Sequence, residues 1–242
     1  MNLRSVPELP STTKYINMES CCSLKPSPAL LRQSSLSRPC SSPFLRKYES
    51  SGGLAFTILN RYLQGLFCQK IGYETATKRK EDGSKTEFQI IIPRCLFPRW
   101  LTYQSWGNSI SVVLSPNWCN SRWMGFTLCA LFTTSRLAYS GFRARVKAIG
   151  DMPHSQYVSQ LFFRYFSKQH HVWLLYLSRD DWFSTVGNGE CSQIEVVFEE
   201  DSGSSFLSTI NPVGRCGVGL VYEQDMELME ELNQAKCTMQ QQ

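Results

Sequence analysis

Residues 109–114 read Ser-Ile-Ser-Val-Val-Leu and residues 193–198 read Gln-Ile-Glu-Val-Val-Phe, and these two stretches decide the fold class. Successive side chains of a β-strand point to opposite faces of the sheet. The apolar residues of each stretch therefore share one face: Ile110, Val112 and Leu114 in the first, and Ile194, Val196 and Phe198 in the second. Alternation of this kind predicts β-strands with one buried face and one face in water.

Short apolar stretches of the same length recur along the chain. We expect strands at residues 70–76, 86–92, 109–114, 124–133, 142–149, 171–177, 193–198 and 217–222. Residues 124–132 are nearly all apolar, which indicates a central strand buried on both faces. Glu81-Asp82-Gly83-Ser84 predicts a hairpin between the first two strands, because Asp-Gly supplies the positive φ of a tight turn. Many short strands without long helices between them predict an all-β, antiparallel sandwich of the jelly-roll or immunoglobulin-like kind.

Two stretches have helical rather than strand periodicity. Apolar residues recur at helical spacing just after residue 53: Ala55, Ile58, Leu59, Tyr62, Leu63 and Leu66. This spacing predicts a short amphipathic helix that caps an open end or edge of a sheet. A weak, exposed helix is expected at residues 223–236, followed by a frayed end, and we take residues 226–242 as an acidic tail.

The first 53 residues differ in composition from the rest of the chain. They hold six of the eleven prolines and twelve serines, which is typical of loops and linkers. Within them, Leu3, Val6 and Leu9 have the spacing of a turn of a leucine-rich solenoid. One turn cannot bury its own apolar face without neighbouring repeats. We therefore expect a remnant of a terminal leucine-rich repeat at residues 1–27 and a Ser/Pro-rich linker at 28–53, with this whole region disordered when it stands alone.

Charge and hydropathy exclude several classes of protein. The net charge is +5, but it divides into +4 over residues 1–53, +9 over 54–189 and −8 over 190–242. The basic run Lys78-Arg79-Lys80 is followed at once by Glu81-Asp82, which indicates a solvated loop rather than a nucleic-acid site. No stretch approaches the roughly 18–20 apolar residues of a membrane span, and the N-terminus lacks the apolar region of a signal peptide. We expect a soluble, intracellular protein.

The sequence contains no motif for catalysis, cofactors or metals. The ten cysteines have no repeated spacing, so we expect small buried side chains in a reducing compartment rather than a zinc site. There is no phosphate-binding loop, and Gly187-Asn188-Gly189-Glu190 is interpreted as a turn. A Cys-His pair would need His170 or His171 beside Cys191, and nothing in the spacing demands it. We predict a protein that is not an enzyme, with no catalytic, cofactor-binding or metal-binding residues.

The most informative side chains are aromatic and basic residues in or beside the predicted loops. Trp, Tyr and Arg dominate the binding energy of protein interfaces. Our candidate protein-binding residues, chosen by loop placement and residue type, are Arg94, Trp100, Trp106, Arg122, Trp123, Arg179 and Trp182. Two alternatives stay open. Several of the rings could plug the ends of the sandwich, or they could form stacking platforms for sugars or other small ligands.

Residues 92–112 carry a specific resemblance. They read Ile-Pro-Arg-Cys-Leu-Phe-Pro-Arg-Trp-Leu-Thr-Tyr-Gln-Ser-Trp-Gly-Asn-Ser-Ile-Ser-Val. This resembles the I-P-G-S-x-I-P-x-W-F-x-x-Q-S-x-G-x-S motif of the C-terminal jelly-roll/Ig-like domain that follows the leucine-rich repeats of plant TIR-NB-LRR disease-resistance receptors. The similarity continues through residues 114–118, 124–130, 171–174, 194–198 and 216–222. Arg94-Cys95-Leu96 departs from the motif by replacing a small, acidic turn with a basic, bulkier one.

The resemblance implies a recognition domain at residues 54–225. Such a domain works with its neighbouring leucine-rich repeats to bind a pathogen effector protein in the cytoplasm or nucleus, in the plant defence response. The family's NAD-consuming TIR domain and its nucleotide-binding domain have no counterpart in these 242 residues, so neither activity is expected here. The alternative is a jelly-roll module that binds a carbohydrate or another small ligand.

Overall fold

The chain forms two β-sheets packed face to face, with a helix on the outside of the larger one. The structure is a computed structural model and describes residues 13–18, 53–72, 87–93, 97–133, 139–149, 156–164, 170–186, 191–201 and 213–226. The elements in chain order are β1 (Tyr15–Asn17), α3 (Gly53–Gly72), β2 (Phe88–Pro93), β3 (Tyr103–Trp106), β4 (Ser109–Val113), β5 (Trp123–Thr133), β6 (Tyr139–Ile149), β7 (Tyr157–Arg164), β8 (His170–Ser178), α4 (Arg179–Thr185), β9 (Gln193–Asp201) and β10 (Val213–Tyr222).

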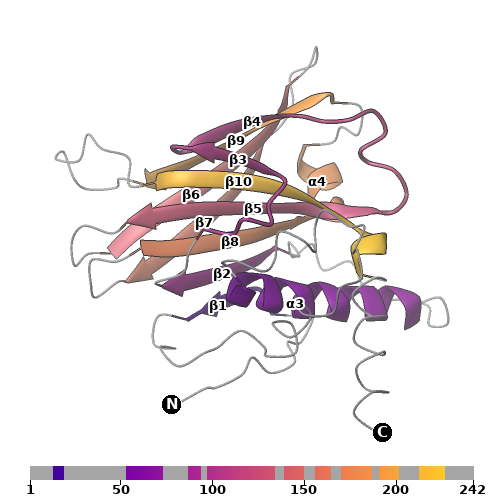
Figure 1. Ribbon diagram of the computed structural model, residues 1–242, viewed down its shortest axis with the longest axis horizontal. Coiled ribbons are helices and arrows are strands. Elements are labelled where there is room, and N and C mark those ends of the chain that lie inside the picture. The colour runs from indigo at the N-terminus through magenta and orange to yellow at the C-terminus, as the bar shows by residue number, and fades with distance from the viewer. Residues whose placement is uncertain are drawn as a thin grey trace, which may run out of the picture.

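The sheet topology confirms the predicted all-β sandwich. The six-stranded sheet has the order β1-β2-β8-β5-β10-β3, and the four-stranded sheet has the order β4-β9-β6-β7 (Figure 1). Among the described strands every pairing is antiparallel except that of β1 with β2, which is parallel. The two sheets bury a common core that includes Ile110, Val112, Ile194, Val196 and Phe198, the residues whose alternation predicted it.

Strand β5 is the central strand that its apolar sequence predicts. It pairs with β8 on one side and β10 on the other. Its side chains on one face, such as Leu128, belong to the core between the sheets, whereas Cys129 on the other face belongs to a second buried cluster. Because both faces are covered, the sequence of this strand is continuously apolar rather than alternating.

The second cluster lies between α3 and the outer face of the six-stranded sheet. The Tyr62 ring of α3 stacks on Phe88 of β2 with 3.9 Å between centroids, and it meets the Tyr176 ring of β8 edge-on at 6.0 Å. The predicted helix is thus confirmed, but at 20 residues it is longer than expected. Figure 1 shows it beside β1 and β2, at one edge of the six-stranded sheet, so the helix takes the expected edge position rather than an open end, and it covers part of the outer face there. None of the described helices has the length and hydropathy of a membrane span.

Most predicted strands agree with the structure, and the exceptions have physical reasons. The strand expected at residues 70–76 is wrong at 70–72, which continue α3, and residues 73–76 lie outside the described ranges. The helix continues through these residues beyond Leu66, the last described side chain of α3 that packs against the second cluster. The hairpin expected at 81–84 also lies outside the described residues.

Three of the described strands were not predicted. β1 and β3 are too short, at three and four residues, to display an alternation. In β7, Ser159 takes a buried position on the same side of the strand as the buried Tyr157 and Leu161, and this polar residue interrupts the apolar pattern. Of the weak C-terminal helix, residues 223–226 are helical with Met226 buried, and the rest lies outside the described part.

Candidate functional site

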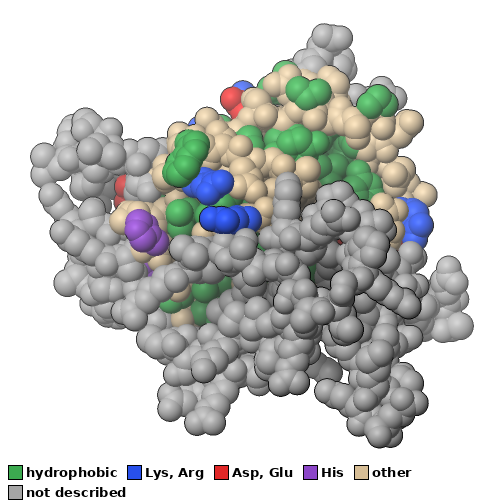
Figure 2. Space-filling model, viewed as in Figure 1, with side chains coloured by type: hydrophobic (Ala, Val, Ile, Leu, Met, Phe, Trp, Pro, Cys, Tyr) green, Lys and Arg blue, Asp and Glu red, His purple; other side chains and the backbone are tan. Residues whose placement is uncertain are grey.

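The most exposed large hydrophobic side chain among the described residues is Trp106, at the end of β3. It is 80% exposed. The Arg215 guanidinium of β10 lies 5.1 Å from the centre of the Trp106 ring and 4.7 Å from the centre of the Phe97 ring. Figure 2 shows hydrophobic and basic side chains side by side on this face, with polar surface above them. We call Trp106, Arg215, Phe97 and Gln104 the Trp106 platform.

Hydrogen bonds fix the cation of the Trp106 platform. Arg215 Nη2 donates to Gln104 Oε1 at 2.7 Å. The amide nitrogen of Gln104 in turn donates to the carbonyl oxygens of Leu101 at 2.8 Å and Arg99 at 3.1 Å. A cation over an exposed ring contributes about 0.5–1 kcal/mol. The fixed cation therefore favours this orientation of the indole in the free chain, which lowers the entropic cost of binding a partner there.

The backbone beside the platform crosses from one sheet to the other. Gly107 has φ +87, a conformation that favours glycine, and its N–H donates to the Gly214 carbonyl at 3.0 Å. The next residue, Asn108, accepts from the Phe198 N–H at 2.7 Å and donates through its side-chain amide to the Phe198 carbonyl at 3.1 Å. These bonds anchor the crossing at both ends. It joins β3, at the edge of the six-stranded sheet, to β4, at the edge of the four-stranded sheet.

An open, polar hollow lies between β3 and β4 at this side of the sandwich. Its lining is Thr102, Tyr103, Gln104, Ser105, Ser109, Ile110, Ser111 and Glu195. Hydroxyl groups predominate, and the Glu195 carboxylate is already paired with the Lys147 ammonium at 2.6 Å. Tyr103, one of the lining residues, is partly buried and packs against the core between the sheets. The platform and this hollow, which share Gln104, form one continuous candidate site.

Three of the predicted site residues belong to the core. Trp100, Trp123 and Trp182 are 2%, 1% and 0% exposed. Trp123 and Trp182 join Trp118 in a cluster of edge-on rings, with centroids 4.7 to 6.5 Å apart. Trp100 meets Phe56 of α3 edge-on at 5.4 Å. These rings fill the sandwich and the space under α3, as the alternative of plugging rings anticipated, and they are not presented at the surface.

The predicted arginines have separate positions. Arg179, at the start of α4, donates to the carbonyl oxygens of Asn120 at 3.0 Å and Ser121 at 3.1 Å, and its guanidinium lies 5.5 Å from the Phe183 ring. Arg122 is half-exposed, with its Nε 4.0 Å from the Glu223 carboxylate. Both lie near the C-terminal end of β10, whereas Trp106 lies at its N-terminal end. Arg94 lies outside the described residues.

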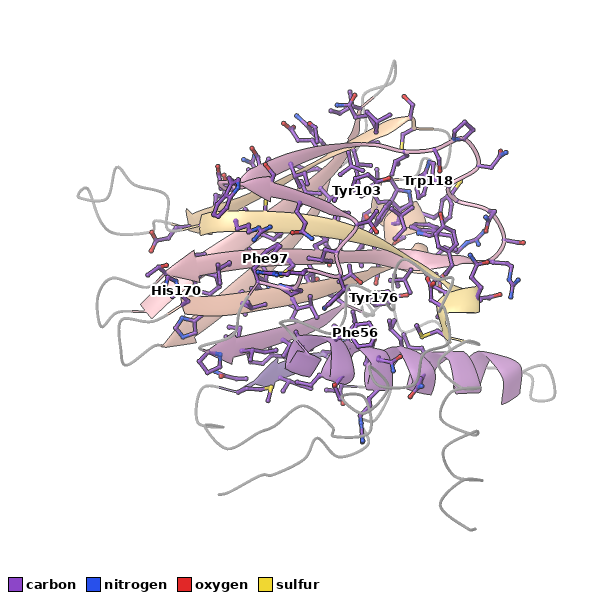
Figure 3. The ribbon with its side chains drawn as sticks, viewed as in Figure 1. Phe56, Phe97, Tyr103, Trp118, His170 and Tyr176 are labelled. Carbon is purple, nitrogen blue, oxygen red and sulfur yellow. The ribbon has the colours of Figure 1, made fainter. Side chains whose placement is uncertain are left out.

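The arrangement separates the groups that a Cys-His hydrolase would need to join. The His170 imidazole shares a hydrogen bond with the Thr133 hydroxyl at 2.8 Å, at one end of β8. Trp118 Nε1 donates to the Cys191 carbonyl at 2.9 Å, and the Trp118 ring packs against Trp182 of α4, just beyond the other end of β8. The two ends of this nine-residue strand lie about 25 Å apart at the usual rise of a strand. Figure 3 shows His170 and Trp118 on opposite sides. Burial raises the pKa of the Cys191 thiol to about 11. No metal-binding group occurs within the described ranges.

The sequence criteria selected Trp106 but not Arg215 and Phe97, which lie beside it in the structure. Arg215 lies in a strand and Phe97 is buried, so neither has the loop character used as a criterion. One signal was available for Arg215. It is one of only two basic residues in the acidic segment 190–242, and such an isolated cation in a strand needs a specific environment.

Together, the fold and the site describe a β-sandwich domain with a preformed aromatic surface at one edge and no assembled catalytic group among its described residues. The family model of the C-JID domain matches residues 92–227, more than half of the chain. The chain belongs to the C-JID domain family. This agrees with the predicted resemblance to the domain that follows the leucine-rich repeats of plant TIR-NB-LRR resistance proteins.

The similar proteins are disease-resistance proteins of Arabidopsis thaliana. The chain is 25% identical to Disease resistance protein RPS4B over 249 residues, covering 92% of this chain and 20% of that protein. It is 30% identical to Disease resistance protein RPS4 over 133 residues, covering 54% of this chain and 11% of that protein. With Disease resistance-like protein CSA1 the identity is 28% over 142 residues. The chain spans a fifth or less of the length of these relatives.

Proposed function

We propose that this chain is a protein-recognition module of a plant intracellular immune receptor, and that it contributes to the binding of a pathogen effector protein. The observation that carries the proposal is the Trp106 platform, an indole that is 80% exposed and oriented by Arg215. Family membership supplies the context, because the similar proteins are disease-resistance proteins.

The physical argument is that the Trp106 indole is exposed and also lies against a fixed cation, Arg215. Trp, Tyr and Arg are the residues most enriched in binding hot spots, and the platform presents an exposed Trp beside an Arg. At this platform both are held by the strands of a rigid sheet rather than by a loop. Such an arrangement supports recognition of a surface, since a partner need not order the side chains on binding.

The domain organisation extends the same proposal. We assign residues 1–27 to the end of a leucine-rich repeat, 28–53 to a linker, 54–225 to the recognition domain and 226–242 to an acidic tail. The parallel pairing of β1 with β2 supports the first assignment, because repeats of this kind stack their strands in parallel. The preceding repeats and the effector are the partners, and the cytoplasm or nucleus is the location.

The proposal assigns no enzymatic activity to this chain. The TIR and nucleotide-binding activities of the resembled receptors belong to other domains, and recognition is the contribution of this one. Its ligand is a protein surface and no cofactor takes part.

The test is binding of the full chain to a panel of purified effector proteins from plant pathogens, measured by biolayer interferometry. We expect at least one effector to bind, and Trp106→Ala to weaken that binding by about 2 kcal/mol or more, the cost that defines a hot spot. Arg215→Gln should weaken it less, because the indole remains but loses its orientation.

Phe183→Ala is the matched control. Phe183 is also exposed, at 38%, and it also lies beside an arginine, but at the opposite end of β10. Binding that survives Trp106→Ala and is lost with Phe183→Ala would move the site to the α4 end. Absence of binding to every effector in the panel would count against recognition of this class of partner.

A further inference from the structure

We propose that an extended segment of the bound partner adds to the four-stranded sheet as a further strand, along the free edge of β4. The inference rests on the proposed function and specifies how the partner is held. The partner segment has a simple chemistry. It is an extended stretch of polypeptide with an acidic side chain at the end that lies beside the Trp106 platform.

The free edge follows from the sheet order. β4 pairs with β9 and is the outermost strand of its sheet among the described elements. The Phe198 N–H donates to the Asn108 carbonyl, and the Leu114 N–H donates to the Ser192 carbonyl. Residues of an antiparallel pair alternate between facing the neighbour and facing away. Ile110 and Val112 therefore complete the ladder to β9, and the backbone groups of Ser109, Ser111 and Val113 point to the free edge.

This edge lacks the features that normally prevent strand addition. Natural sheets protect their edges with lysine, proline, bulges or very short strands. β4 reads Ser-Ile-Ser-Val-Val, it has a regular register with β9, and its Val113 side chain is 71% exposed. β3, the edge strand of the other sheet at this side, is less suitable, because it has only four residues and Gln104 is committed to Arg215 and the backbone.

The surroundings of the edge select the chemistry of the partner segment. Hydroxyl groups of Ser109 and Ser111 line the hollow beside it and can bond to a second polypeptide. The one carboxylate of the hollow, Glu195, is neutralised by Lys147. Within the platform Arg215 is half-buried, and the exposed Arg99 accepts from the Gln104 amide through its backbone carbonyl. The positive charge that remains favours an acidic side chain, and strand addition provides the main-chain bonds that give affinity.

The first measurement needs no partner. Amide hydrogen exchange of the full chain, read by NMR, should be at least about tenfold faster at Ser109, Ser111 and Val113 than at Ile110 and Val112, because only the latter two amides are bonded within the sheet. Equal protection of all five amides would mean that the edge is already covered in the chain, and the inference would fall whatever the chain binds.

The second measurement compares Ser111→Pro with Ser111→Ala. Proline removes an N–H that faces the free edge, so the ladder to β9 stays intact and the urea midpoint should stay close to that of Ser111→Ala. The probe is a phage-displayed library of random dodecapeptides panned on the full chain. We expect acidic, extended peptides whose binding persists in Ser111→Ala and falls by about tenfold or more in Ser111→Pro.

Four further results would overturn the inference. The first is that no peptide is selected, or that selected peptides bind Ser111→Pro as tightly as Ser111→Ala. The second is a dimer of the full chain in sedimentation that Ser111→Pro dissociates, which would give the edge to a second copy. The third is a soluble oligosaccharide whose binding requires Trp106 and is indifferent to Ser111→Pro. Effector binding that needs Trp106 but tolerates Ser111→Pro would refute strand addition and leave the proposed function standing.

Discussion

Replacement of Tyr157 by Phe tests how the two sheets are held together at the side of the sandwich opposite to β3 and β4. The Tyr157 hydroxyl of β7 donates to the Glu87 carboxylate, just before β2, at 2.5 Å. The Ser159 hydroxyl and the Gln89 amide also donate to this carboxylate. Trp173 Nε1 of β8 donates to Gln89 Oε1 at 3.2 Å. One anion thus links β2 of the larger sheet to β7 of the smaller one.

The magnitude follows from the charge of the acceptor. A hydrogen bond to a charged group contributes about 1.5–3 kcal/mol, whereas a neutral one contributes about 1 kcal/mol. Tyr176 supplies the neutral comparison, because its hydroxyl donates to the Met124 carbonyl at 2.8 Å. Both tyrosines are buried. We expect Tyr157→Phe to lower the free energy of unfolding by about 2 kcal/mol, and Tyr176→Phe by about 1 kcal/mol.

The assay is urea unfolding of the full chain followed by tryptophan fluorescence, with a double-mutant cycle of Tyr157→Phe and Glu87→Gln. The slope against urea should stay constant while the midpoint falls, which indicates a change in stability alone. A coupling energy of about 1–2 kcal/mol is expected for two groups in direct contact. A coupling near zero, or a larger loss for Tyr176→Phe than for Tyr157→Phe, would refute the charged link between the sheets.

Three further outcomes are expected. Trp182→Ala should cost about 3–5 kcal/mol in urea unfolding, because it removes a fully buried ring, and Phe183→Ala should cost much less. Burial raises the pKa of Tyr62 to about 12 from 10.0. The stability that its neutral form contributes is complete below pH 10 and is lost between about pH 10 and 12, so Tyr62→Phe should weaken the fall in stability over that range. The Cys216 side chain is fully buried, and burial raises the pKa of its thiol to about 11, so at pH 8 it should react with Ellman's reagent only after unfolding.

The sequence predicted the sandwich well because its decisive signals are local. Alternation in residues 109–114 and the apolar run of residues 124–132 reflect burial on one face and on both faces of a sheet. The extent of α3 was harder to predict, because the helix continues through residues 70–72, where we expected a strand. β7 was missed because Ser159 is buried beside Glu87, and only the folded chain brings these two residues together.

The site was predictable only in part. Loop placement and residue type selected Trp106, but the same criteria selected Trp123 and Trp182, whose rings the structure buries in the core. An aromatic residue near a predicted turn is buried or exposed according to which side of the sheet it faces, and a single residue at a strand end carries no periodicity to show this. The pairing of Trp106 with Arg215, 109 positions along the chain, depends on the register of β3 and β10.

Hydroxyl-radical footprinting by mass spectrometry tests the recognition surface most directly. The full chain is oxidised alone and in complex with an effector that binds it. In the free chain Trp106 should be modified readily and the buried Trp182 should not. In the complex we predict strong protection of Trp106 and unchanged modification of Phe183. Protection of Phe183 with Trp106 still modified would contradict the account.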